Sequence, residues 1–290
     1  MRQRRKGERV DLTRRRLVVG MGAAGFALAA GPASAQVITT PSEGLITADH
    51  KVRSGADSIP VYEARPSGAG RHPVIIVIHE NVGVHEYIRD VARRFAREGY
   101  VALAPDLFSR EGVAQMSDMG KVREAVGRVS DRQVLQDLVA TAEFGTRQPY
   151  VRADRVGATG FCWGGRIAWL FAATYKDLDA AVIWYGRIAS PQKDDLHPKD
   201  PLDLAKEVVC PVLGLYGEAD TGIPVADVRK MEGALKAAGK TAEFVVYPGA
   251  GHAFFSDYRP SYLPEPAKDG WQRALAWFAR YQKSRRRHWK

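Results

Sequence analysis

The chain has 290 residues, of which 45% are apolar, with 43 Lys and Arg against 33 Asp and Glu. This length and apolar share are typical of a globular protein, and no internal repeat or low-complexity linker divides the sequence. The net charge of +10 is strongly basic. Much of that charge lies near the amino terminus, so it does not by itself indicate an anionic partner.

The first 35 residues have the three-part pattern of an export signal. The run Thr13-Arg14-Arg15-Arg16-Leu17-Val18 resembles a twin-arginine motif, and an apolar, Gly- and Ala-rich stretch over residues 17–30 follows it. Small residues at positions 33–35 predict cleavage before Gln36. The apolar stretch is shorter than the roughly 20 residues that cross a bilayer. We therefore expect a cleaved signal over residues 1–35, a periplasmic or secreted product, and no membrane association after cleavage.

Without this leader the charge becomes ordinary. The leader holds eight Lys or Arg and two Asp or Glu, so the totals fall to 35 and 31 and the net charge to +4. The remaining basic cluster lies within residues 283–290, where a solvated tail is the simpler interpretation. No basic face with a binding motif is evident, so we expect no nucleic-acid partner. Residues 36–290 are predicted to form a single domain, whose oligomeric state the sequence leaves open.

After residue 70, short apolar runs alternate with helical patterns, which is typical of a parallel sheet covered by helices on both faces. Residues 44–64 instead indicate an antiparallel strand pair that turns at residues 54–57. The predicted fold class is α/β, a doubly wound, mostly parallel sheet with an antiparallel N-terminal edge. We expect strands over residues 74–78, 100–104, 155–161, 180–185, 212–216 and 242–247, and helices over residues 87–97, 132–144, 163–175, 225–238 and 267–281.

In such a sheet, functional groups gather in the loops at the carboxyl ends of the strands. Four predicted strand ends carry reactive residue types, and three of them follow the chain order nucleophile, acid, histidine of an α/β-hydrolase triad. The four are His79-Glu80, Cys162, Asp220 and His252.

Cys162 stands in the sequence GATGFCWGG, where a strand passes into a helix between Gly160 and Gly164. This is the shape of a nucleophile elbow with a thiol in place of the hydroxyl. The start of the following helix favours negative charge and would stabilise a thiolate. Cys210, the other cysteine, precedes a strand and should lie at the opposite edge of the sheet, so we expect no disulfide.

His252 stands in a small-residue loop, GAGHAFF, where a neutral imidazole can take a thiol proton and return it to a leaving oxygen. Asp220 would fix the tautomer of that imidazole. Glu218 is the rival carboxylate. The segment HENVGVH spaces His79 and His85 six residues apart across a turn, which does not match the metal-binding spacing of a zincin helix. We interpret it as the oxyanion loop, with the backbone N–H groups of Asn81 and Trp163 as donors. No metal or cofactor is expected.

At these residues the sequence resembles the dienelactone hydrolase family of α/β hydrolases. The resemblance is carried by the Glu80 loop, REGYVALAPDLF, GFCWGG, YGEAD and GAGHAFF, in that order along the chain. It implies a triad of Cys162, Asp220 and His252. It also implies that Glu80 contacts the resting thiol and helps to remove its proton when substrate arrives.

The sequence departs from that family in the residues that bind a substrate carboxylate. Family members carry an arginine four residues after the histidine, where this chain has Ser256. Arg259, three residues further on, could substitute for it in binding a substrate carboxylate, but a solvated arginine is the simpler interpretation. A second family arginine falls in a stretch that here holds four arginines, none of which can be aligned: Arg110, Arg123, Arg128 and Arg132.

The leading functional prediction is an exported, carboxymethylenebutenolidase-like hydrolase of small esters or lactones, which acts through a thioester on Cys162. The alternatives are a thioesterase or broader carboxylesterase on the same triad, and a non-catalytic α/β-hydrolase scaffold that binds a ligand. Residues 106–130 and 186–206, which are polar insertions, are predicted to wall the substrate pocket.

Overall fold

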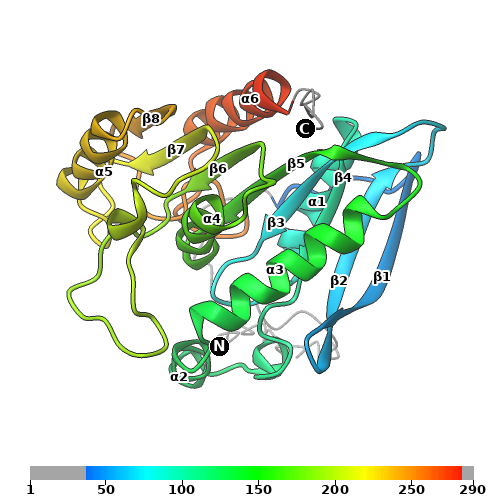
Figure 1. Ribbon diagram of the computed structural model, residues 1–290, viewed down its shortest axis with the longest axis horizontal. Coiled ribbons are helices and arrows are strands. Elements are labelled where there is room, and N and C mark those ends of the chain that lie inside the picture. The colour runs from blue at the N-terminus through cyan, green and yellow to red at the C-terminus, as the bar shows by residue number, and fades with distance from the viewer. Residues whose placement is uncertain (1–36, 283–290) are drawn as a thin grey trace, which may run out of the picture.

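The computed structural model describes residues 37–282 of the chain, so the predicted signal and the basic C-terminal cluster lie outside the described residues. A single eight-stranded sheet forms the centre (Figure 1). Its order is β1-β2-β4-β3-β5-β6-β7-β8. The strands are β1 (Leu45–Ser54), β2 (Asp57–Pro66), β3 (His72–Ile78), β4 (Val101–Pro105), β5 (Val151–Phe161), β6 (Ala180–Trp184), β7 (Val212–Gly217) and β8 (Ala242–Tyr247).

Six adjacent strands pair in parallel, in the sheet order β4-β3-β5-β6-β7-β8. The strand β2 pairs antiparallel with both β1 and β4. The central strands are buried on both faces, which explains their unbroken apolar runs, such as VIIVI in β3. The edge strand β1 instead exposes charged side chains such as Asp49, Lys51 and Arg53, which discourage pairing with another chain. The predicted fold class is confirmed.

Helices cover both faces of the sheet. In Figure 1, α3 crosses in front of β3 and β5, and α1 lies behind β2 and β4. The helices α1 and α6 share one face, because Phe95 of α1 packs on Trp271 and Phe278 of α6. The helices are α1 (Glu86–Arg97), α2 (Met119–Gly127), α3 (Asp131–Thr146), α4 (Trp163–Thr174), α5 (Val225–Ala237) and α6 (Pro264–Tyr281), with short 3₁₀ turns at Val113–Gln115 and Pro201–Leu204.

The expected elements match these within a few residues at each end, but α2 was missed. It lies within residues 106–130, which were interpreted only as a polar pocket wall. The helix contains two glycines, Gly120 and Gly127, and buries only Val122 and Ala125. Its start is stabilised by Asp118, whose side chain accepts hydrogen bonds from two backbone N–H groups of the first turn. Among residues 37–282, no helix is long and apolar enough to span a membrane.

The register of the parallel strands brings their carboxyl ends to one edge. Ile78 at the end of β3 pairs with Gly160, and Phe161 at the end of β5 pairs with Trp184 of β6. The loops that carry Glu80, Cys162, Asp220 and His252 therefore leave the sheet on the same side. Cys210 precedes β7 at the opposite edge, and the two cysteines form no disulfide, as expected.

Candidate active site

Cys162 occupies a strained corner between β5 and α4. Its backbone has φ 56° and ψ −114°, a conformation that costs energy in any residue with a side chain. The Cys162 N–H donates to the Trp184 carbonyl oxygen over 3.1 Å, which ties the corner to β6. A Cβ on Gly160 would lie 2.0 Å from the Gly164 carbonyl oxygen, so only glycine allows the turn to close this tightly. The thiol is partly exposed.

His252 and Asp220 form a hydrogen-bonded pair. The Nδ1 atom of His252 lies 2.6 Å from Oδ2 of Asp220, whose side chain is only 2% exposed. The other oxygen, Oδ1, accepts the N–H groups of Gly222 and Ile223, so the carboxylate cannot turn away. Glu218, the rival acid, is exposed and accepts the Gly249 N–H instead. Of the two carboxylates, it is Asp220 that orients the imidazole.

The His252 ring also interacts with Cys162. Although burial lowers the pKa of His252, the hydrogen bond to Asp220 and the interaction with the Cys162 sulfur raise that pKa to about 10. At neutral pH the imidazole is therefore charged. Tyr185 packs against this ring at a centroid distance of 5.2 Å. The structure thus brings Cys162, His252 and Asp220 together.

Glu80 is fully buried, and its oxygens accept hydrogen bonds from two side chains that follow His252. Ser256 Oγ donates to Oε1 over 3.0 Å, and the Tyr258 hydroxyl donates to Oε2 over 2.5 Å. The Tyr185 hydroxyl lies 3.1 Å from Ser256 Oγ and extends the network toward the Cys162 corner. In the described chain, Glu80 therefore hydrogen-bonds these hydroxyls and not the thiol.

Arg259 is not the solvated arginine expected from the sequence. Its guanidinium lies 3.6 Å from Glu80 Oε2, donates to the Tyr258 hydroxyl over 2.9 Å, and stacks over the Tyr258 ring. Burial lowers the pKa of Arg259, but the Glu80 carboxylate and the hydrogen bond to Tyr258 outweigh it, so the net shift of the pKa is upward. The expectation was wrong because the turn Ser256–Arg259 folds the side chain back onto a buried carboxylate, which no local pattern reveals.

The two predicted oxyanion donors lie on adjoining loops. Trp163 is the first residue of α4, so its backbone N–H has no acceptor within the helix. Asn81 follows Glu80 at the end of β3 and is partly exposed. The loops touch at Gly164, where a Cβ would lie only 2.3 Å from the His79 carbonyl oxygen. This close approach brings the start of α4 against the oxyanion loop.

The histidines of this loop do not form a metal centre. His79 is fully buried and uses both ring nitrogens, one beside the Glu80 carbonyl and the other beside the Leu107 N–H. His85 lies 4.0 Å from Glu80, and burial lowers its pKa to about 4, so it is neutral at pH 7. Within residues 37–282, no group of three or more His, Cys, Asp or Glu side chains is arranged to hold a metal ion.

The arginines of the predicted pocket wall are directed elsewhere. Arg110 forms ion pairs with Asp137 and Asp57, and Arg128 pairs with Glu124. Arg123 and Arg132 are exposed on the surface. No contact of these four with the Cys162, Asp220 or His252 side chains is found in the described structure, whereas Arg259 interacts electrostatically with Cys162.

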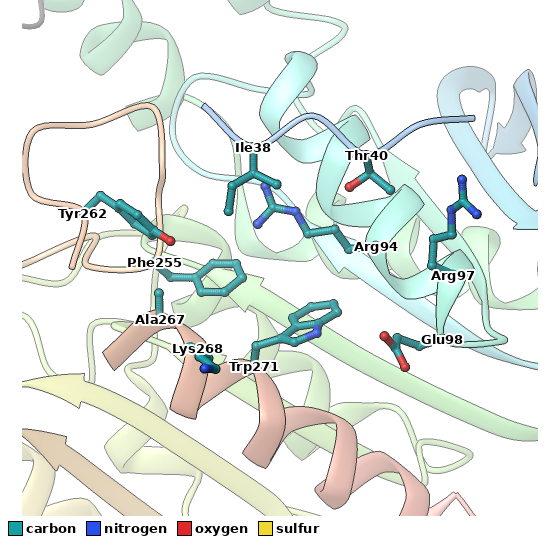
Figure 2. Close-up of a pocket in the computed structure, with 10 residues that line it drawn as sticks. All are labelled: Ile38, Thr40, Arg94, Arg97, Glu98, Phe255, Tyr262, Ala267, Lys268 and Trp271. Atoms are coloured by element: carbon teal, nitrogen blue, oxygen red, sulfur yellow. The ribbon is translucent and has the colours of Figure 1, made fainter. Parts of the chain in front are cut away.

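A cavity of about 360 Å³ lies apart from the triad, between α1, α6 and the segment that precedes β1 (Figure 2). Figure 2 shows Phe255 and Trp271 on one side of it and Ile38 and Arg94 on the other. None of the predicted site residues lines this cavity. Phe255 is close to His252 in sequence, but its ring packs against Phe161 and Trp184 in the core.

Ser256, Tyr258 and Tyr185 were missed as site residues. Ser256 was noted only as a departure from the family, although HAFFSDYR places both Ser256 and Tyr258 within six residues of His252. Tyr185 directly follows β6 and could have been found by applying the strand-end rule to that strand as well.

Comparison with known proteins agrees with this geometry. A sequence model of the dienelactone hydrolase family matches residues 59–282, and the chain belongs to that family. The chain is 48% identical over 273 residues, 93% of its length and 94% of the relative's, to a protein from Methylorubrum extorquens provisionally named a carboxymethylenebutenolidase. A relative of the same name from Escherichia coli K12 is 46% identical over 260 residues, covering 89% of this chain and 95% of the relative.

A solved structure from Klebsiella pneumoniae, described as a provisional dienelactone hydrolase, is also similar. It is 49% identical with a TM-score of 0.79, and the alignment covers 82% of this chain and 99% of that one. Family and fold together identify the protein as an α/β hydrolase that acts on carboxylic ester or lactone bonds of a small-molecule substrate.

Proposed function

We propose that this chain hydrolyses small esters or lactones through a thioester on Cys162, with Asp220 and His252 completing the triad. The observation that carries this proposal is the placement of His252, which is hydrogen-bonded to buried Asp220 and interacts with the sulfur at the strained corner. The relatives named as carboxymethylenebutenolidases support a lactone as one substrate class.

Acylation would begin once the Cys162 thiol has lost its proton, beside a charged His252 imidazole. The Cys162 sulfur attacks the carbonyl carbon, and the resulting oxyanion accepts the N–H groups of Trp163 and Asn81. As the bond from carbon to the leaving oxygen breaks, His252 gives that oxygen its proton. Asp220 holds Nδ1 throughout, so Nε2 carries the proton that is transferred.

Deacylation reverses the roles. Neutral His252 takes a proton from a water molecule, and the oxygen of that water attacks the thioester carbonyl. The bond between carbon and sulfur then breaks, which releases the acid and restores the thiolate beside the imidazolium. A thiolate is a good leaving group, so a thioester intermediate suits activated esters and enol lactones.

We also propose that Glu80 assists thiol deprotonation when an anionic substrate approaches. Glu80 now hydrogen-bonds Ser256 and Tyr258 and lies near Arg259. A substrate carboxylate that attracts Arg259 would weaken that pairing and leave Glu80 free to accept the thiol proton. Because Ser256 replaces the arginine of dienelactone hydrolases, uncharged esters are proposed as substrates alongside dienelactone.

The direct test is hydrolysis of p-nitrophenyl acetate and of a cis-dienelactone by the wild-type chain and by Cys162→Ala. We expect turnover that the substitution abolishes. Equal activity in the variant would remove the cysteine mechanism, and failure of the wild type to hydrolyse any ester or lactone would favour the ligand-binding scaffold.

Export through a twin-arginine signal is proposed from residues 1–35. Replacing Arg14 and Arg15 with lysine should keep the processed form out of the periplasm, because that pathway recognises the arginine pair. The matched control is lysine at Arg4 and Arg5, which makes the same change outside the motif. Equal export of both variants would contradict the proposal.

A further inference from the structure

We infer that His79 is a positioning residue, which orients the Asn81 N–H toward the oxyanion and holds the Trp163 segment beside it. The inference deepens the proposed function and depends on it. His79 is fully buried at the carboxyl end of β3, next to Glu80, and no catalytic step described above uses it.

The hydrogen bonds of His79 define its tautomer. Its Nε2 atom accepts the Leu107 N–H over 3.1 Å, so Nδ1 carries the hydrogen and donates it to the Glu80 carbonyl oxygen over 2.6 Å. Burial lowers the pKa of His79, which keeps the ring neutral and this arrangement intact at neutral pH.

The Glu80 carbonyl and the Asn81 N–H belong to one planar peptide group and point in opposite directions. A bond that fixes the carbonyl therefore also fixes the direction of the N–H. The Gly83 N–H donates to the same carbonyl over 3.2 Å and closes a tight turn, with Gly83 at φ 81°. With two donors on its oxygen, this peptide group cannot rotate without losing hydrogen bonds in a buried site.

The faces of the His79 ring connect the two donor loops. The ring stacks on Trp163 at a centroid distance of 5.6 Å and an interplanar angle of 12°, and Phe108 contacts both rings at 4.7 and 4.4 Å. His79 thus supports the Asn81 donor through a hydrogen bond and the Trp163 donor through packing. Such preorganised donors are the largest single contribution in many acyl-transfer sites.

The test compares His79→Asn with His79→Leu, which have nearly the same shape. The Asn amide nitrogen can occupy the place of Nδ1 and still donate to the Glu80 carbonyl, whereas Leu cannot. Both lose the acceptor for the Leu107 N–H and leave the same space. We expect the acylation rate with p-nitrophenyl acetate to be about 10- to 100-fold lower in His79→Leu than in His79→Asn.

Alkylation of Cys162 by iodoacetamide provides a readout that needs no oxyanion donor. We expect its rate to stay within about twofold of wild type in both variants, because displacement at a saturated carbon develops no oxyanion. If His79→Leu does not fold, His79→Phe, which keeps a ring against Trp163, takes its place. His72→Asn is the matched control, since His72 also donates to a carbonyl, that of Gly99, at the opposite end of β3.

Equal acylation rates in the Leu and Asn variants would overturn the inference, as would parallel losses of acylation and alkylation. These outcomes are distinct from a failure of the proposed function, which would appear as undiminished hydrolysis by Cys162→Ala.

Discussion

Cys162 and Cys210 place the same side chain at opposite ends of one parallel sheet. Cys162 follows β5 at a backbone φ of 56° and is partly exposed, whereas Cys210 precedes β7 and is 4% exposed among apolar neighbours. Backbone strain is also found at the end of the sheet that carries Cys162. Among residues 37–282, the non-glycine residues with positive φ are Cys162, Tyr185 and Ala253, and all lie in loops at the carboxyl end.

Four buried polar groups of the candidate site lie at the same end. His79, Glu80, Asp220 and Ser256 are each at most 4% exposed, and all four are hydrogen-bonded. A strained backbone reduces stability, so its restriction to these loops among the described non-glycine residues favours a functional role there. The backbone strain and the candidate nucleophile therefore share the carboxyl end of the sheet, whereas Cys210 at the amino end belongs to the apolar core.

The largest effect should come from exchanging the two cysteines for alanine. Cys162→Ala should lower kcat/KM for p-nitrophenyl acetate by about 10⁴-fold or more, since the nucleophile is lost. Cys210→Ala should leave it within about twofold and should lower only the melting temperature. Steady-state kinetics and thermal unfolding measure both. A comparable loss of activity in the two variants would contradict the assignment of a catalytic role to Cys162 and a packing role to Cys210.

A smaller loss is expected from the acid of the triad. Asp220→Asn should reduce kcat by about 10³- to 10⁴-fold, because the amide no longer holds the correct His252 tautomer. Glu218→Gln is the control two residues earlier, on an exposed carboxylate that contacts Gly249. Rate measurements that ranked Glu218 above Asp220 would contradict the assignment.

Glu80→Gln should have an intermediate effect. We expect the rate of acylation by an anionic lactone such as a cis-dienelactone to fall by about 100-fold, the range of general acid–base assistance. The control is Glu86→Gln in the same segment, where the carboxylate is exposed and pairs with Arg93. An unchanged acylation rate with that substrate in Glu80→Gln would leave Glu80 with only a structural role.

The smallest effect concerns stability and pH. The His252 pKa is raised from 6.5 to about 10 on folding, so its ion pairs stabilise the protein fully below pH 6.5. That contribution should decline as the pH rises from 6.5 to 10, because the unfolded state loses the proton first. The melting temperature of the wild type should fall more over this interval than that of His252→Gln. Parallel curves would show that the raised pKa is absent.

Much of the fold could be predicted because its signals are local. The apolar runs of β3, β5, β6 and β7 and the glycines around Cys162 define strands and the elbow without knowledge of distant contacts. The helix α2 was missed because it is short, polar and contains glycine. Its formation depends on the cap at Asp118 and on packing with the rest of the chain.

The candidate site was predictable where a side chain follows a strand end, as for Cys162, Asp220 and His252. The environment of Glu80 was not. Its partners Ser256 and Tyr258 lie more than 170 residues away in sequence, and Arg259 reaches Glu80 only because a tight turn redirects it. Likewise the use of both ring nitrogens of His79 depends on Leu107, from a different loop.

The most direct test of the account is to trap the acyl intermediate with p-nitrophenyl acetate. Rapid acid quench followed by peptide mass analysis should find the acetyl group on the peptide that contains Cys162, formed at the rate of the initial p-nitrophenol burst. An acetyl group on another residue, or turnover with a burst and no adduct on Cys162, would contradict the central claim that this sulfur is the nucleophile.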